Sequence, residues 1–122
     1  MTLVDTSVWA DHLRAADSGM TRLLDAGQIA MHPFILGEIS LGHLKPRHAI
    51  LDMLASLPSA DVADEAEILQ FIEKVGLFGT GIGYVDVHIL ASARLAFTPL
   101  WTRGKRLRAV AERLGIAAKG LK

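Results

Sequence analysis

The chain contains no cysteine among its 122 residues. This excludes disulfide bonds and metal sites built on thiolates, and it agrees with a reducing cytoplasm. No apolar run approaches the roughly 20 residues that a membrane-spanning helix needs. Met1 is followed by strand-like residues rather than by the basic segment of a secretory signal. We therefore expect a cytoplasmic protein that makes no contact with a membrane.

The chain also has no net charge, because 13 Lys and Arg residues balance 13 Asp and Glu residues. This argues against a protein that coats nucleic acid indiscriminately. The charges are nevertheless uneven, since seven bases and a single acid lie between Arg103 and Lys122. Such a segment can contact a polyanion locally, and it can equally be the solvated face of a helix.

Short apolar runs alternate with longer stretches of helical periodicity. The runs predict strands at 2–5, 28–31, 59–63, 98–102 and 115–118. The periodicity predicts helices at 7–14, 33–44, 46–57, 64–75, 84–96 and 104–114, with a shorter one around Leu23 that Gly27 ends. No internal repeat or linker interrupts this pattern, and the length suits one α/β domain over residues 1–122.

Strands that are separated by helices run parallel, because connections of this length exclude hairpins. In an open parallel sheet, the functional crevice lies beyond the carboxyl ends of the strands. Asp5 ends the first predicted strand and Thr102 ends the fourth, so both are expected at this crevice.

Two further acids lie inside apolar helical segments: Glu38 in "FILGEISLGHL" and Asp86 in "GYVDVHILASA". An ionised carboxylate among apolar residues needs a partner. A divalent cation is one partner that Asp5, Glu38 and Asp86 can share. Oxygen ligands without cysteine favour magnesium or manganese over zinc, and such an ion can activate water against a phosphate.

Each acid also has a purely structural interpretation. Asp5 can cap the first helix, although Thr6 or Ser7 can do so in its place. Asp86 can cap the helix that follows the glycine-rich loop at 76–83, and Glu38 can be an exposed helix former. These alternatives stay open at the level of the sequence.

Other polar residues carry less information. No two histidines have the i, i+4 spacing of a helical zinc site, and we expect the histidines on the surface or in loops, with His88 the one candidate for the crevice. The glycine-rich loop lacks the lysine of a P-loop. Trp9 and Trp101 are expected to fill core or interface space.

The ordered set of motifs resembles the PIN domain, and specifically the VapC-type toxins of bacterial toxin–antitoxin pairs. "VDTSVW" resembles the family's first strand and its first acid at Asp5, "FILGEISLGHL" its second acid at Glu38, and "GYVDVHILASA" its third acid at Asp86. The resemblance implies a three-layer α/β/α fold with a short central parallel sheet of four to five strands. It covers nearly the whole chain.

The resemblance further implies a metal-dependent endoribonuclease, neutralised by a cognate VapB-type antitoxin. Asp5 and Asp86 would bind Mg²⁺ or Mn²⁺ directly, and Glu38 would act through water or orient the nucleophile. Thr102 would hydrogen-bond in the acidic pocket, and the basic segment after it would contact RNA phosphates. The implied partners are an RNA substrate, the antitoxin and a second copy in a homodimer.

The sequence departs from the family at "LWTRGKRL", where the usual Thr-x-Asp-Lys places a fourth acid and this chain has Gly104. Gly104 favours one alternative to a fully active nuclease, a weakly active or inactive PIN-fold module that dimerises and binds antitoxin. A separate alternative is a phosphotransfer domain of the same broad architecture, which would need an acid two residues after Asp5, where Ser7 stands instead.

Overall fold

The predicted sheet lies at the centre of the molecule. In the computed structural model, which describes all 122 residues, it has three parallel strands in the order β2-β1-β3. The strands are β1 (Thr2–Val4), β2 (Ile29–Ala30) and β3 (Leu100–Trp101). The paired residues are Thr2 with Ile29, Leu3 with Ala30 and Leu100, and Val4 with Trp101. β1 is therefore the central strand, and the chain leaves it at Asp5.

The expectation of four to five strands was too high. Residues 59–63 and 115–118 each contribute a single parallel bridge, Ser59 beside Met31 and Ala117 beside Leu100. Gly115 and Gly120 both have φ near +70°, so the chain turns away on either side of Ala117. After Ser59, the chain soon leaves the sheet to enter a helix that Asp64 caps.

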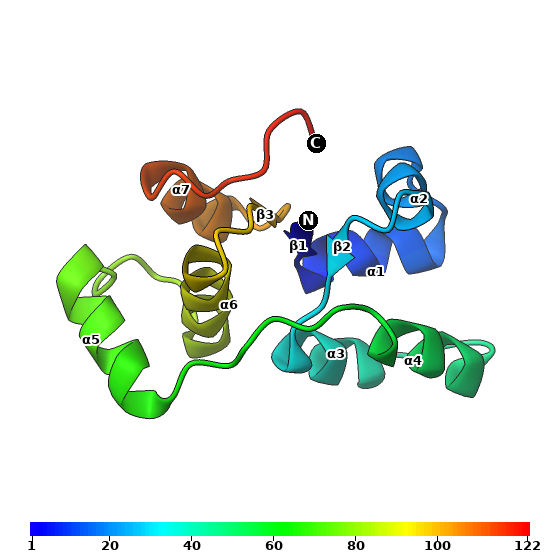
Figure 1. Cartoon of the computed structure of the whole chain (residues 1–122), viewed down its shortest axis with the longest axis horizontal. Coiled ribbons are helices and arrows are strands. Elements are labelled where there is room, and N and C mark those ends of the chain that lie inside the picture. Colours follow the sequence, from blue (N-terminus) through cyan, green and yellow to red (C-terminus); the bar gives the residue numbers. More distant parts are fainter.

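Seven helices cover this sheet. They are α1 (Thr6–Arg14), α2 (Ser18–Asp25), α3 (Pro33–Ser40), α4 (Arg47–Ala55), α5 (Glu65–Val75), α6 (Tyr84–Leu95) and α7 (Lys105–Arg113). Figure 1 shows α1 to α4 on the right of the strands and below them, and α5 to α7 on the left. The sheet thus lies between two groups of helices, as the α/β/α prediction requires.

Most helices match the predicted segments, but α3 is shorter than expected. It ends at Ser40, so Leu44 lies outside it. Arg47 explains the early stop, because its guanidinium donates hydrogen bonds to the carbonyl oxygens of Ser40 and Gly42 at 2.7 and 3.2 Å. These carbonyls have no partner farther along a helix, and the arginine satisfies them.

One hydrophobic core joins the two groups of helices through the sheet. It contains 24 buried residues, and Trp9 and Trp101 are among them, as predicted. Leu3 and Val4 of β1 are fully buried. None of the helices combines the length and the hydropathy that crossing a bilayer requires.

Candidate active site

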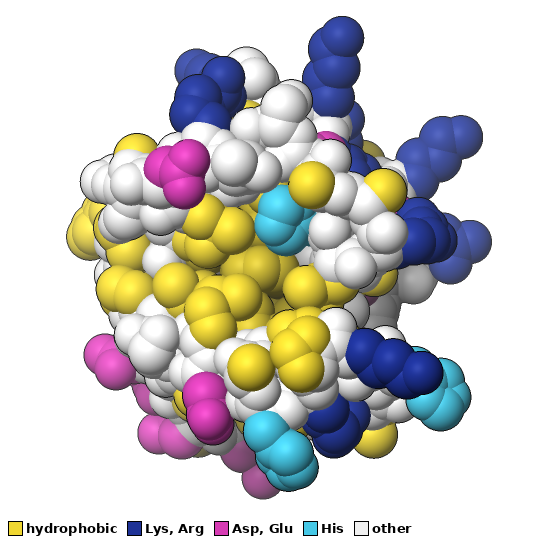
Figure 2. All heavy atoms as spheres, turned by 90° about the vertical axis from the view of Figure 1, so that its right-hand side faces the viewer, with side chains coloured by type: hydrophobic (Ala, Val, Ile, Leu, Met, Phe, Trp, Pro, Cys, Tyr) yellow, Lys and Arg dark blue, Asp and Glu magenta, His cyan; other side chains and the backbone are white.

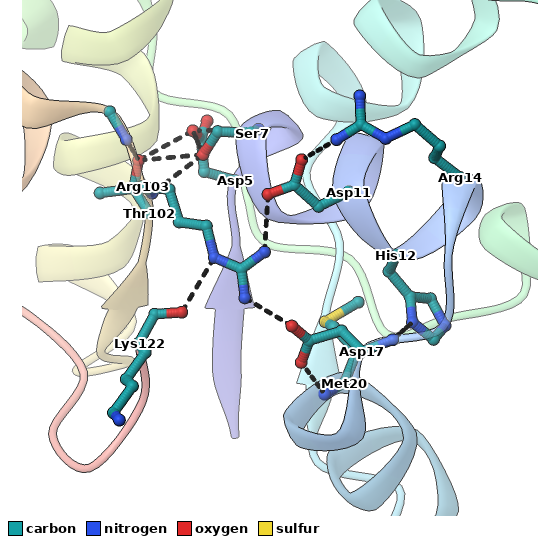
Figure 3. Close-up of polar contacts among 11 residues, drawn as sticks. Asp5, Ser7, Asp11, His12, Arg14, Asp17, Met20, Thr102, Arg103 and Lys122 are labelled. Carbon is teal, nitrogen blue, oxygen red and sulfur yellow. Dashed lines mark hydrogen bonds and ion pairs between the residues drawn. The ribbon is translucent and has the colours of Figure 1, made fainter.

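Asp5 follows the central strand directly and is the N-cap of α1. The residue is buried, with 8% of its surface exposed. Oδ2 accepts hydrogen bonds from the N–H of Ser7 at 3.3 Å, the hydroxyl of Ser7 at 2.7 Å and the hydroxyl of Thr102 at 2.9 Å. Figure 3 shows both hydroxyls directed at this carboxylate. Oδ1 accepts no hydrogen bond from the chain, so one oxygen is held in place and the other can take a ligand.

The suggestion that Thr6 or Ser7 would cap α1 in place of Asp5 was wrong. The capping role of Asp5 nevertheless leaves room for the metal-binding role expected of it. Capping uses Oδ2 alone, and a carboxylate has acceptor sites on both oxygens. The hydroxyl of Thr6 is directed elsewhere, to Oε1 of Glu38 at 2.8 Å.

Thr102 occupies the position that the sequence predicts, at the end of β3 beside Asp5. It is 4% exposed, and its hydroxyl donates to Asp5 while it accepts the N–H of Gly104 at 3.1 Å. The predicted hydrogen bond in the acidic pocket is therefore confirmed. Ser7, which the sequence offers only as a possible cap, makes a parallel set of contacts: its hydroxyl donates to Asp5 and accepts the N–H of Arg103.

Glu38 lies on the exposed side of α3, as its interpretation as an exposed helix former predicts. Its side chain is still tied to the candidate site, since Thr6 is the residue next to Asp5. α1 and α3 pack against each other, which brings Glu38 within hydrogen-bonding distance of the residue after Asp5.

Asp86 lies in the first turn of α6 and is half-buried. It does not cap the helix, because the N-cap is Gly83. Burial raises the pKa of Asp86, and the negative charges of Asp5 and Glu38 raise it further. The three acids therefore share one electrostatic field, although they come from three separate segments of the chain.

None of these three acids takes part in an ion pair; the four ion pairs of the protein lie elsewhere. Their repulsion is thus left without a basic partner. Hard oxygen donors with uncompensated charge suit Mg²⁺ or Mn²⁺. The donor chemistry fits such an ion, but no three acidic or histidine side chains stand together as a ready-made ligand set.

Two histidines depart from the expectation that the histidines lie on the surface or in loops. His32 is fully buried and His88 is 5% exposed. Nδ1 of His32 accepts the N–H of Phe34 at 3.0 Å, which caps α3, and Nε2 lies 3.1 Å from the hydroxyl of Ser92. Burial, and next the charge of His88, lower the pKa of His32 to about 4. These contacts require neutral His32 with its proton on Nε2, because Ser92 donates its own proton to the carbonyl of Asp61.

A second unpredicted cluster surrounds Arg103. We expected this residue, with the basic segment that it begins, to contact RNA. Its guanidinium pairs with Asp11 at 2.7 Å and Asp17 at 2.6 Å, and all three side chains are partly exposed (Figure 3). This pairing lowers the pKa of Asp17 and raises that of Arg103.

The chain is similar to known proteins over nearly its whole length. Ribonuclease VapC32 of Mycobacterium tuberculosis H37Rv is 42% identical over 118 residues, which are 96% of this chain and 95% of the relative. The VapC32 of strain CDC 1551 / Oshkosh matches equally well. No protein-family model matches the chain.

Among solved structures, the crystal structure of PAE2754 from Pyrobaculum aerophilum has the same fold. The two superpose with a TM-score of 0.61 and 16% identity, over 93% of this chain and 94% of the other. At that identity the likeness concerns the fold alone. The similarity to VapC32, over almost all of both sequences, establishes that the chain belongs to the VapC-type PIN-domain family.

Proposed function

We propose that this chain is a metal-dependent endoribonuclease toxin that a cognate antitoxin neutralises. The family membership supports the ribonuclease activity, since the relative is named a ribonuclease. In this proposal, Asp5 and Asp86 bind Mg²⁺ or Mn²⁺ directly, and Glu38 binds through water or orients the nucleophile.

The observation that supports the proposal is the arrangement of the acids: Thr6, next to Asp5, donates to Glu38 at 2.8 Å, and none of the three acids pairs with a base. The raised pKa of Asp86 agrees with this arrangement, since burial is its first cause and the charges of Asp5 and Glu38 follow. Perturbed carboxylates in one field are a common feature of functional sites.

Each residue has a distinct part in this proposal. Ser7 and Thr102 hold Oδ2 of Asp5, which leaves Oδ1 to face a ligand. Thr6 restrains Glu38 at the rim. Asp86 completes the negative field from the first turn of α6. A bound divalent ion would activate a water and neutralise charge that develops on the phosphate.

The test is the cleavage of a single-stranded RNA with Mn²⁺, comparing the parent with Asp5→Asn. Asn keeps the capping ability of Asp, so the variant should fold. We expect its cleavage rate to fall at least about 100-fold, as for the loss of other central electrostatic groups. Asp52→Asn, on the exposed side of α4, is the matched control. Equal rates for Asp5→Asn and the parent would refute the assignment.

A second candidate function is a PIN-fold module that binds antitoxin but cuts RNA weakly. Gly104 favours it, because an ideal Cβ at this position would lie 3.4 Å from the hydroxyl of Thr102. The first atom of a side chain there would contact Thr102, whose hydroxyl donates to Asp5. The fourth acid is absent at a place where the fold has room for one.

This chain has a groove beside Glu38 that suits the docking of an antitoxin. A cavity of about 390 Å³ is lined by Thr6 and Glu38 and by apolar residues of α1, of α3 and of the segment between α3 and α4, among them Leu13, Ile39 and Leu44. Figure 2 shows hydrophobic side chains in a hollow on this side of the molecule. We propose that an apolar antitoxin segment lies here, with a basic side chain near Glu38.

The homodimer is also a proposal. A separate groove of about 280 Å³ lies between α5 and α6, away from the acids. At its edge Leu95 is 62% exposed, and Phe97 just beyond it is 95% exposed. Exposed apolar groups beside a groove suit a protein contact. Sedimentation of the parent and of Leu95→Lys tests this, since only the parent should dimerise.

A further inference from the structure

Arg103 connects the candidate site with helices α1 and α2. Its backbone N–H donates to the hydroxyl of Ser7 at 3.0 Å, inside the acidic pocket. Its side chain extends the other way, to Asp11 on α1 and to Asp17, the N-cap of α2. Figure 3 shows both halves of this arrangement.

The side-chain contacts of Arg103 are strong by the standards of this protein. One guanidinium bridges two carboxylates at 2.7 and 2.6 Å, and Nε donates to the carbonyl of Lys122 at 2.9 Å. The same group lies 5.3 Å from the centre of the ring of Trp101. The side chain is 26% exposed, against 50% for Arg108, which pairs with one carboxylate only. Planar, multiply bonded guanidinium groups hold neighbouring elements more firmly than exposed single pairs.

The backbone of 102–104 sets the direction of two hydroxyl groups. The N–H of Arg103 donates to Ser7 Oγ, and the N–H of Gly104 donates to Thr102 Oγ1. Each hydroxyl has one proton, and each directs it to Oδ2 of Asp5, at 2.7 and 2.9 Å. A shift of this segment would therefore remove the fixed orientation of both donors to Asp5.

We propose that Arg103 is a positioning residue for Asp5. Its guanidinium fixes 102–104 against α1 and α2, and the segment in turn holds Ser7 and Thr102 on the carboxylate. This role is separate from the RNA contact that the resemblance implies for the basic segment. The part of the inference that concerns metal and RNA rests on the proposed function.

The experiment compares Arg103→Met with Arg108→Met, which removes an exposed pair on α7 that does not reach the site. Amide hydrogen exchange, measured without metal, reports on the N–H groups of residues 103 and 104. We expect both to exchange at least about 10-fold faster in Arg103→Met and to be unchanged in Arg108→Met. Unchanged exchange in both variants would refute the positioning role.

Calorimetric titration with Mn²⁺ then measures the consequence for Asp5. We expect the dissociation constant to rise about 10-fold in Arg103→Met, as for other losses around metal ligands. The kcat for RNA should fall while KM stays within about twofold, because Arg103 does not touch the substrate. Faster amide exchange with unchanged Mn²⁺ affinity would show that the segment is held for another reason, and would overturn the inference.

A double-mutant cycle with Thr102→Val separates positioning from a general loss of stability. If Arg103 acts through the hydroxyls, adding Arg103→Met to Thr102→Val should change Mn²⁺ affinity much less than it does in the parent. Fully additive effects would contradict the proposal. A parent that bound no Mn²⁺ would instead remove the proposed function, while the amide-exchange comparison would still decide whether Arg103 holds the segment.

Discussion

Replacing Gly104 with an acid tests whether one site contains all the family's carboxylate positions. Gly104 is the N-cap of α7 and has no side chain to accept the free N–H groups of the first turn. Asp and Asn both cap well. They have the same shape, so Gly104→Asn is the control that isolates the charge of Gly104→Asp.

The size of the effect follows from two distances. The new Cβ would lie 3.4 Å from Thr102 Oγ1, which is 2.9 Å from Oδ2 of Asp5. The two carboxylates would then stand on the order of 5 Å apart. Unit charges at that distance repel by about 1 kcal/mol in water and about 3 kcal/mol at an effective dielectric constant of 20. A negative charge at the start of α7 recovers about 0.5 kcal/mol from the helix dipole.

We therefore expect metal-free Gly104→Asp to be about 1–2 kcal/mol less stable than Gly104→Asn at pH 7. Urea unfolding measures this difference. Asp5 would raise the pKa of the new carboxyl in the folded state. The penalty is then complete above that raised pKa and disappears below about pH 4, where the carboxyl is protonated in both the folded and the unfolded chain.

A divalent metal ion should make Gly104→Asp more stable than Gly104→Asn. With the fourth acid in place, we expect Mn²⁺ to bind at least about 10-fold more tightly to Gly104→Asp than to Gly104→Asn, and to stabilise it correspondingly. RNA cleavage should rise with the same variant. Equal stability and equal Mn²⁺ affinity would mean that position 104 does not face the acids, which would refute the reasoning.

Three other variants test separate parts of the structure. Asp86→Asn should raise the melting temperature of the metal-free protein above pH 5, since the raised pKa of Asp86 marks a charge that the fold disfavours. Between pH 6.5 and about 4, His32 should lower the stability of the parent by up to about 3 kcal/mol, because the unfolded chain alone protonates it. In urea titrations at each pH, His32→Asn should remove this contribution and leave the fall that the buried His88 causes. Leu44→Asp should weaken antitoxin binding at least about 10-fold without changing RNA cleavage. Leu41→Asp, at an exposed position outside the groove, should change neither antitoxin binding nor RNA cleavage.

The sequence predicts the order of elements well because most boundaries have local causes. Asp64 and Glu67 form a capping box at the start of α5, and Gly76 ends the helix in the left-handed conformation. The strands are harder to predict, since pairing depends on partners that are distant in the chain. Ala117 and Ser59 lie in apolar runs, yet each makes one bridge and no strand.

Some residues of the candidate site can likewise be predicted from the sequence, whereas others become apparent only in the fold. The sequence places Asp5, Glu38 and Asp86 at chemically conspicuous positions, because an acid in an apolar segment can be seen without coordinates. It presents Ser7 only as a possible helix cap, and it does not distinguish Arg103 from the bases that follow it. Their importance comes from contacts with Thr102, Asp11 and Asp17 that the fold alone creates.

The positions of the charges suggest why this protein keeps two kinds of acidic cluster. Asp11 and Asp17 are neutralised by Arg103 within the fold, so they add stability without any ligand. Asp5, Glu38 and Asp86 have no such base, and their repulsion remains in the metal-free protein. A base among them would stabilise the chain and would also occupy the place of the ion. The acids that hold the structure are therefore paired internally, whereas those proposed to bind metal depend on a partner from outside, whether a cation or a basic side chain of the antitoxin.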